Sequence, residues 1–134
     1  MTALHHIALR AVDFDATVRF YRDAFGYGAP RVWSYPPHVE KAAFLPAPDG
    51  SWLEIFADGV ASSWEEPKEG LVHFALHVDD VDEGYERALA AGATTIAPPA
   101  SFTIAGNPGW DVRLAFVQGL CGERIEIYRT TIEP

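Results

Sequence analysis

A short strand-like motif that occurs twice most constrains how this chain of 134 residues can fold. Residues 6–9 read HIAL and residues 73–76 read HFAL, so both contain histidine, an apolar residue, alanine and leucine in that order. An aspartate follows each histidine by seven residues, at Asp13 and at Asp80. Aspartate is favoured at helix N-termini, and apolar residues at helical spacing come after both aspartates. Each half of the chain is therefore predicted to open with a strand followed by a helix.

Three short segments rich in β-branched and aromatic residues follow each predicted helix, separated by proline and glycine clusters. The last segments also match, because WLEIF at 52–56 resembles RIEIY at 124–128. Each half therefore reads β-α-β-β-β, and the duplication predicts one α+β domain over residues 1–134. Two repeats of roughly 65 residues are too few and too long for a solenoid. We expect module one at about 1–58, a turn-rich linker at about 59–70 and module two at about 71–134.

Two histidines and two glutamates fall on matching faces of the matching strands. Since side chains alternate along a strand, His6 and His73 lie on the face opposite the apolar residues that a helix would cover. Glu54 and Glu126 lie between aromatic or long side chains on the last strands, where a carboxylate is unfavourable unless it is paired or bound to a cation. Any one of the four alone is more often a structural or exposed residue. Their symmetry suggests a site for a divalent metal, namely Zn, Ni, Co, Mn or Fe(II).

Composition excludes several classes of partner. The formal net charge is −9 and no lysine or arginine cluster is present, which argues against nucleic acid and anionic lipid. No apolar run approaches the ~20 residues of a membrane span, and the N-terminus lacks the pattern of a signal peptide. The single cysteine, Cys121, excludes an internal disulfide and fits a reducing compartment. We expect a cytoplasmic protein that binds a small molecule, not nucleic acid or membrane.

Four segments together resemble the glyoxalase/bleomycin-resistance/dioxygenase superfamily, also called vicinal oxygen chelate proteins. They are HIALRAVDFDATVRFYRDAFGYG, WLEIF, HFALHVDDVDEGYERALAAGA and CGERIEIYR. The resemblance implies two tandem β-α-β-β-β modules that form a curved mixed sheet around a metal-binding cavity. It places one metal ligand on the first and one on the last strand of each module, at His6, Glu54, His73 and Glu126. It also implies a homodimer, in which modules of two chains complete each cavity, although pairing within one chain is the alternative.

The four ligands most resemble those of bacterial glyoxalase I. This likeness implies a metal-dependent lyase or isomerase that acts on a small α-hydroxy-carbonyl or related substrate. Glu126 would then abstract the proton next to a metal-chelated carbonyl, while Glu54 is chiefly a ligand. The alternatives are a metal-dependent dioxygenase or thiol transferase of the same superfamily, and a non-catalytic small-molecule binding or resistance protein. Dioxygenases and thiol transferases use two histidines and one glutamate, and bleomycin-binding members lack the ligands.

Three further residues are expected to bind substrate: Arg10, His77 and Trp110. Arg10 matches an arginine that contacts glutathione in glyoxalase I, and His77 occupies the equivalent place in module two. Asp58, however, stands where glyoxalase I has an asparagine, so we expect that the glutathione hemithioacetal of methylglyoxal is not the best substrate. Trp110 ends the proline- and glycine-rich segment 97–110, which is predicted to be a long loop of the kind that forms lids.

Overall fold

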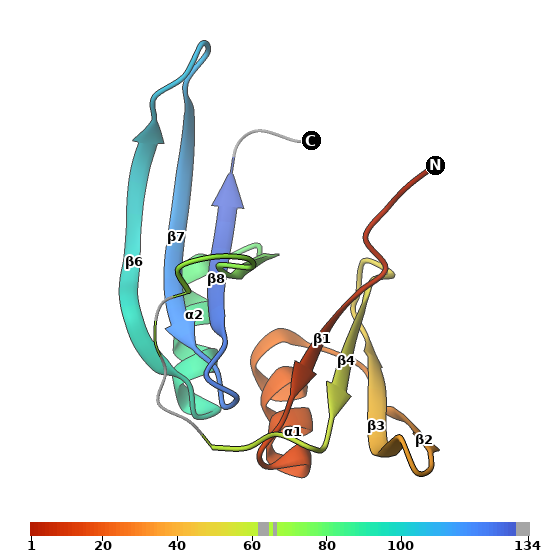
Figure 1. Cartoon of the computed structure of the whole chain (residues 1–134). Coiled ribbons are helices and arrows are strands. Elements are labelled where there is room, and N and C mark those ends of the chain that lie inside the picture. Colours follow the sequence, from red (N-terminus) through yellow and green to blue (C-terminus); the bar gives the residue numbers. More distant parts are fainter. Residues whose placement is uncertain (62–64, 66, 131–134) are drawn as a thin grey trace.

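The computed structural model describes residues 1–61, 65 and 67–130, and Figure 1 shows two modules of the same construction. Module one consists of β1 (His6–Arg10), α1 (Phe14–Phe25), β2 (Arg31–Tyr35), β3 (Val39–Pro46) and β4 (Trp52–Phe56). Module two consists of β5 (Phe74–His77), α2 (Val81–Ala90), β6 (Thr94–Ile104), β7 (Trp110–Gln118) and β8 (Arg124–Thr130). The α+β class and the β-α-β-β-β order of both halves are confirmed.

Each module forms its own four-stranded mixed sheet. The strand orders are β1-β4-β3-β2 and β5-β8-β7-β6, so the first and last strands of each module are neighbours. These two strands run parallel, while the other pairs are antiparallel. As a result β1 and β5 lie at sheet edges, and His6 in β1 and His73 directly before β5 lie next to the strands that carry the glutamates. The expected curved mixed sheet is thus two open sheets within one chain.

The two helices begin where the sequence predicts. Asp13 Oδ1 accepts a hydrogen bond from the Ala16 N–H, and Asp80 Oδ1 accepts one from the Glu83 N–H, each at 3.0 Å. These bonds satisfy N–H groups that have no partner within the first helical turn. Helix α1 ends at Gly26, whose φ of 73° is a left-handed conformation that glycine adopts without strain. The same capping chemistry therefore orients both helices against their sheets.

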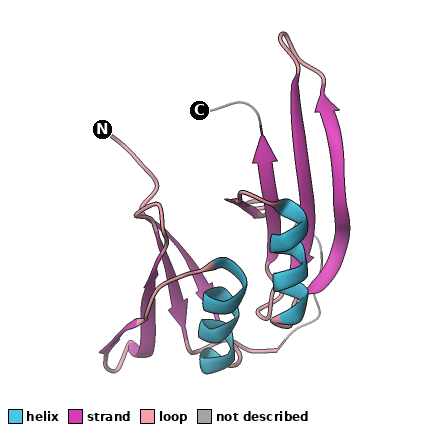
Figure 2. Cartoon of the chain, turned by 180° about the vertical axis from the view of Figure 1, so that it is seen from behind, coloured by secondary structure: helices cyan, strands magenta, loops and turns pink. Residues whose placement is uncertain are grey.

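The core lies between the helices and the inward faces of both sheets. Aliphatic residues of β4 and β8 are almost fully buried, and they alternate with the residues of the histidine–glutamate face; they are Leu53, Ile55, Ile125 and Ile127. Helices α1 and α2 pack against each other at the junction of the modules, as the view from behind shows (Figure 2). Buried residues of both modules form one contiguous hydrophobic cluster. The junction is therefore part of the core, and the glutamate-bearing faces are turned away from it.

The prediction of a long loop over residues 97–110 is wrong. Strand β6 continues through Pro98 and Pro99 to Ile104, so only residues 105–109 connect it to β7. Strand β6 is an edge strand, and its pairing with β7 shifts register on either side of Ala97. Proline is tolerated at an edge or a bulge because no ladder N–H is required there. The result is a long hairpin that extends well past α2 (Figure 1).

Parts of the predicted domain boundaries fall outside the described residues. These are residues 62–64 and 66 of the predicted linker, and residues 131–134 at the end of module two. Among the helices that are described, none combines the length and the apolar character needed to cross a membrane.

Candidate metal and substrate site

In module one, neighbouring strands bring a histidine and a glutamate together. His6 Nε2 lies 3.7 Å from Glu54 Oε1. Glu54 is only 8% exposed, whereas His6 is exposed. Phe44 of β3 pairs with Glu54 in the sheet and meets the His6 ring edge-to-face, with ring centroids 5.3 Å apart. A nitrogen donor and a shielded carboxylate therefore lie side by side against an aromatic ring.

Module two repeats this arrangement with different residues. His73 Nε2 lies 2.8 Å from Glu126 Oε2, and both side chains are largely covered, with exposed fractions of 32% and 12%. Phe116 of β7 pairs with Glu126 and meets the His73 ring edge-to-face at 5.1 Å between centroids. The two modules therefore present the same histidine–glutamate–phenylalanine unit at equivalent positions.

The two phenylalanines of these units were not predicted from the sequence, although their spacing from the glutamates could have identified them. Phe44 precedes Glu54 by ten residues, and Phe116 precedes Glu126 by ten residues. Antiparallel pairing of the third and fourth strands turns this equal spacing into direct opposition across the sheet.

Within one chain the four predicted ligands form two pairs. No group of three or more His, Cys, Asp or Glu side chains that could hold a metal occurs in the part of the chain that the structure describes. Each pair offers one imidazole nitrogen and one carboxylate oxygen, which are ligands that borderline divalent metals accept. Two such pairs make a four-ligand set, so the donor chemistry fits a metal once two half-sites are combined.

A cleft of about 460 Å³ lies between the edge strands of the two modules. His6 and Trp52 line it from module one, and Ala75 and His77 line it from module two. His77 is exposed and shares its strand face with His73. His77 and His6 therefore line the same cleft.

The other two predicted substrate-binding residues lie elsewhere. Arg10 Nε is 3.3 Å from Asp58 Oδ1, and both side chains are about two-thirds or more exposed, at 73% and 67%. Asp58 therefore lies beside the arginine that would face a substrate anion. Trp110 begins β7 opposite Ile104, next to the hairpin turn, and is not among the residues that line the cleft.

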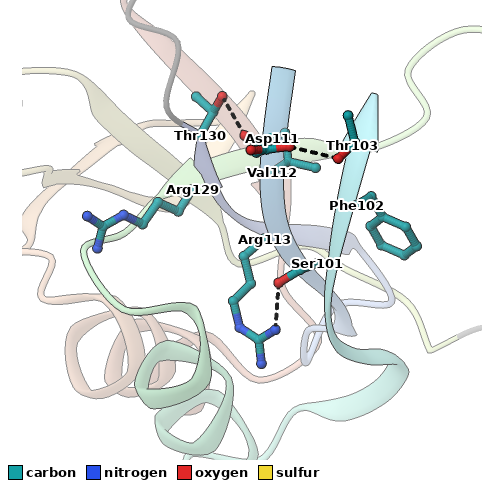
Figure 3. Close-up of a pocket in the computed structure, with 8 residues that line it drawn as sticks. All are labelled: Ser101, Phe102, Thr103, Asp111, Val112, Arg113, Arg129 and Thr130. Carbon is teal, nitrogen blue, oxygen red and sulfur yellow. Dashed lines mark hydrogen bonds between the residues drawn. The ribbon is translucent and has the colours of Figure 1, made fainter. Parts of the chain in front are cut away.

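A second pocket, of about 410 Å³, lies on strands β6, β7 and β8 (Figure 3). Its polar side chains bond to one another, to Asp82 of α2 or, for Arg129, to the Asp79 carbonyl that precedes α2. Thr103 Oγ1 donates to Asp111 Oδ1 at 2.7 Å, and Arg113 donates to Ser101 Oγ at 3.0 Å and to Asp82 at 2.7 Å. Because these groups satisfy each other, they are a structural network that fixes the hairpin to the start of α2.

A polar cluster at the module junction, here called the junction cluster, consists of Thr17, Tyr21, Cys121 and Glu123. The Tyr21 hydroxyl donates to Glu123 Oε2 at 2.6 Å, and the Cys121 N–H donates to Glu123 Oε1 at 2.9 Å. Burial raises the pKa of Glu123 above its ordinary value, and burial together with the Glu123 charge raises the pKa of Cys121 to about 11. The junction cluster joins α1 to the β7–β8 turn, and it holds no predicted site residue.

The family model of the Glyoxalase/Bleomycin resistance protein/Dioxygenase superfamily matches residues 3–127. The chain belongs to this superfamily. Solved structures similar to it include glyoxalase I from Zea mays, with 22% identity and a TM-score of 0.72 over 98% of this chain. The match covers 46% of the maize chain, so this superfamily member spans less than half the length of that relative.

Two other solved structures share the superfamily fold over nearly their whole length. FosX, a fosfomycin resistance protein from Listeria monocytogenes in complex with Mn(II) and sulfate, is 18% identical with a TM-score of 0.71, covering 98% of this chain and 95% of its own. A glyoxalase/bleomycin resistance protein/dioxygenase from Nocardioides is 26% identical with a TM-score of 0.59, covering 100% and 90%. No curated protein matches the chain.

Proposed function

We propose that the protein is a metal-dependent lyase or isomerase of glyoxalase I type. The observation that carries this proposal is the histidine–glutamate–phenylalanine unit, which both modules present on the sheet face turned away from the core. Shielded carboxylates are unfavourable without a positive partner, and here two of them recur at equivalent positions. The substrate would be a small α-hydroxy-carbonyl compound or a related one.

The metal would be held by His6 and Glu54 of one half-site together with His73 and Glu126 of the other. Nitrogen and carboxylate donors suit Ni, Co, Zn, Mn or Fe. When bound, a divalent cation supplies the positive charge that stabilises negative charge developing on two vicinal substrate oxygens. The likeness in fold to glyoxalase I and to a Mn(II)-containing FosX supports a metal, without distinguishing which one.

Glu126 would be the general base that removes the proton next to the substrate carbonyl. Its carboxylate contacts His73 at 2.8 Å, which orients it, and Phe116 lies directly across the sheet from it. Glu54 lies farther from its histidine, at 3.7 Å, and is therefore held less closely. Glu54 would therefore serve chiefly as a ligand.

We also propose a homodimer in which module one of one subunit meets module two of the other. The outer sides of β1 and β5 have no sheet neighbour among the described residues, and such edges are suited to a further strand. Ala8 and Ala75 are exposed beside the histidines and leave room for a facing module. His6 and Glu54 of one chain would then meet His73 and Glu126 of the partner subunit.

A cytoplasmic location fits the single thiol.

The metal site is tested by elemental analysis after anaerobic purification. His6→Ala and His73→Ala should each bind much less metal than the wild type, because each removes one of the four ligands. His38→Ala is the matched control, since His38 is exposed and stacks on Tyr35 outside both half-sites. Unchanged stoichiometry in His73→Ala would contradict the proposal. A monomer in sedimentation that keeps its full metal content would contradict the shared site.

The reaction class is tested by a screen of α-hydroxy-carbonyl and hemithioacetal substrates in deuterated water. Exchange of the substrate carbon proton with solvent is the expected result. Oxygen consumption would indicate a dioxygenase, thiol conjugation a transferase, and tight binding without turnover a non-catalytic binding protein.

A further inference from the structure

Four aromatic side chains, here called the aromatic wall, share the Glu54 face of the sheet of module one. They are Trp33, Phe44, Trp52 and Phe56. Register places them there, since Phe44 pairs with Glu54, and Ala42 pairs with both Trp33 and Phe56. Trp33 stacks on Phe44 at 6.4 Å between centroids and meets Phe56 edge-to-face at 5.9 Å. Phe44 meets Trp52 edge-to-face at 6.2 Å.

The aromatic wall is continuous with the half-site and is not part of the core. Phe44 contacts both Trp52 and the His6 ring, so the rings reach the predicted metal ligand directly. All four rings are only partly buried, whereas Leu53 and Ile55 on the other face of β4 are almost fully buried. A contiguous, partly exposed aromatic surface beside polar groups is typical of a ligand-binding site.

Module two has a different surface at the equivalent positions. Arg124 and Tyr128 flank Glu126 at two residues on either side, where Trp52 and Phe56 flank Glu54. The Arg124 guanidinium lies 4.7 Å over the Phe116 ring. Two aromatic rings therefore flank Glu54, whereas a guanidinium and a phenol flank Glu126.

The charges around the aromatic wall do not favour a substrate with an anionic peptide. Arg10 is paired with Asp58, as described above. Arg31, at the edge of the wall, stacks over the Trp52 ring at 5.9 Å. Both arginines of β1 and β2 thus contact neighbouring side chains, and Phe44 presents an aromatic ring beside His6.

We propose that the substrate carries an aromatic ring, which packs on the aromatic wall while its two vicinal oxygens face the histidine–glutamate pairs. Rings favour edge-to-face and offset contacts with other rings, which four partly exposed aromatic side chains supply. This inference rests on the proposed function above and names its substrate class: aryl-substituted α-hydroxy-carbonyl or α-dicarbonyl compounds.

The test compares two acids with the same pair of vicinal oxygens, benzohydroxamic acid and acetohydroxamic acid, on the metal-loaded protein by calorimetry. Burial of a phenyl group in place of a methyl group should make benzohydroxamic acid bind about tenfold more tightly or better. Trp52→Leu should lose most of this preference and keep its affinity for acetohydroxamic acid, whereas Trp52→Phe should retain the preference. Phe102→Leu is the control, because Phe102 is an exposed aromatic residue of the β6–β7 hairpin, away from the wall.

The outcomes separate this inference from the proposed function. Equal affinity of the wild type for both acids overturns the aromatic subsite and leaves the metal site standing. If neither acid binds to protein with full metal content, the proposed chelation of vicinal oxygens by the metal is wrong. Saturation-transfer NMR with benzyl alcohol then tests separately whether the aromatic wall binds a ring. A signal that Trp52→Leu abolishes supports the wall, and no signal overturns it. If Trp52→Leu dissociates a dimer while the preference persists, the wall is a subunit contact and the inference is wrong.

Discussion

The two modules share the same histidine–glutamate–phenylalanine unit, but the side chains around this unit differ. Both place histidine on the first strand or directly before it, glutamate on the last and phenylalanine across from that glutamate. The pairs differ in closeness, at 3.7 Å in module one and 2.8 Å in module two. The strands differ too, because β6 has 11 residues where β2 has 5. A duplicated framework thus retains the groups that would bind a metal and varies those that would contact the rest of a substrate.

Under the proposed function, this contrast predicts different roles for the two modules. Module one surrounds its glutamate with aromatic rings, and module two surrounds its glutamate with Arg124, Tyr128 and a closely held histidine. Apolar surroundings suit the binding of a substrate group, whereas a carboxylate held in a fixed orientation suits proton transfer. The modules should therefore respond differently to the same substitution.

The largest effect is expected from replacing the two glutamates one at a time. Glu126→Gln removes the proposed base but keeps an oxygen ligand, so turnover should fall by ~10²–10⁴-fold with metal content largely retained. Glu54→Gln should lose much less, because glutamine still coordinates through its amide oxygen. Turnover and metal content of both variants, on any substrate that the screen finds, measure the difference. Small and equal losses would break the proposed asymmetry and point to a base that is not Glu126.

A second test concerns the junction, where the modules meet. With a pKa of about 11, the Cys121 thiol is ionised in roughly one molecule in a thousand at pH 8. Its reaction with Ellman's reagent should therefore be on the order of 100-fold slower than that of glutathione. Glu123→Gln removes a nearby negative charge and should speed the reaction, while unfolding in urea should abolish the protection. A fast native reaction would show that the modules separate readily in solution.

The same junction should give a distinctive dependence of stability on pH. Burial raises the pKa of Glu123 in the folded chain, so the folded state holds its proton more tightly than the unfolded state. The stabilisation is complete below the ordinary glutamate pKa of about 4.3 and is lost as pH rises through the raised pKa. Urea midpoints between pH 4 and pH 7.5 should therefore fall more in the wild type than in Glu123→Gln.

Tyr21→Phe sharpens this test, because its hydroxyl donates to the charged form of Glu123. Without that bond the carboxylate loses a buried partner, and the variant should be less stable by about 1–3 kcal/mol at pH 7. The loss should shrink at pH 4, where the acid is protonated. An equal loss at both pH values would mean that the tyrosine contributes through packing alone.

The sequence predicted those features that depend on local pattern. Alternation, aspartate caps and the repeated motif were sufficient for both helices, the β-α-β-β-β order of elements in each half and the faces of the four candidate ligands. They failed for 97–110, because two prolines normally interrupt a strand and nothing local indicates that β6 is an edge strand with bulges. The junction cluster could not be predicted either, because Tyr21 and Glu123 are 102 residues apart and neither lies in a local sequence pattern that indicates a partner.

The junction cluster also has a consequence for how the chain matures during synthesis. All strands of module one emerge from the ribosome before residue 60, yet the carboxylate that accepts the Tyr21 hydrogen bond is residue 123. Helix α1 packs chiefly against α2 and the β7–β8 turn, which are made later. The first module therefore leaves the ribosome with one side of its helix uncovered, and that side stays exposed until the last turn is translated.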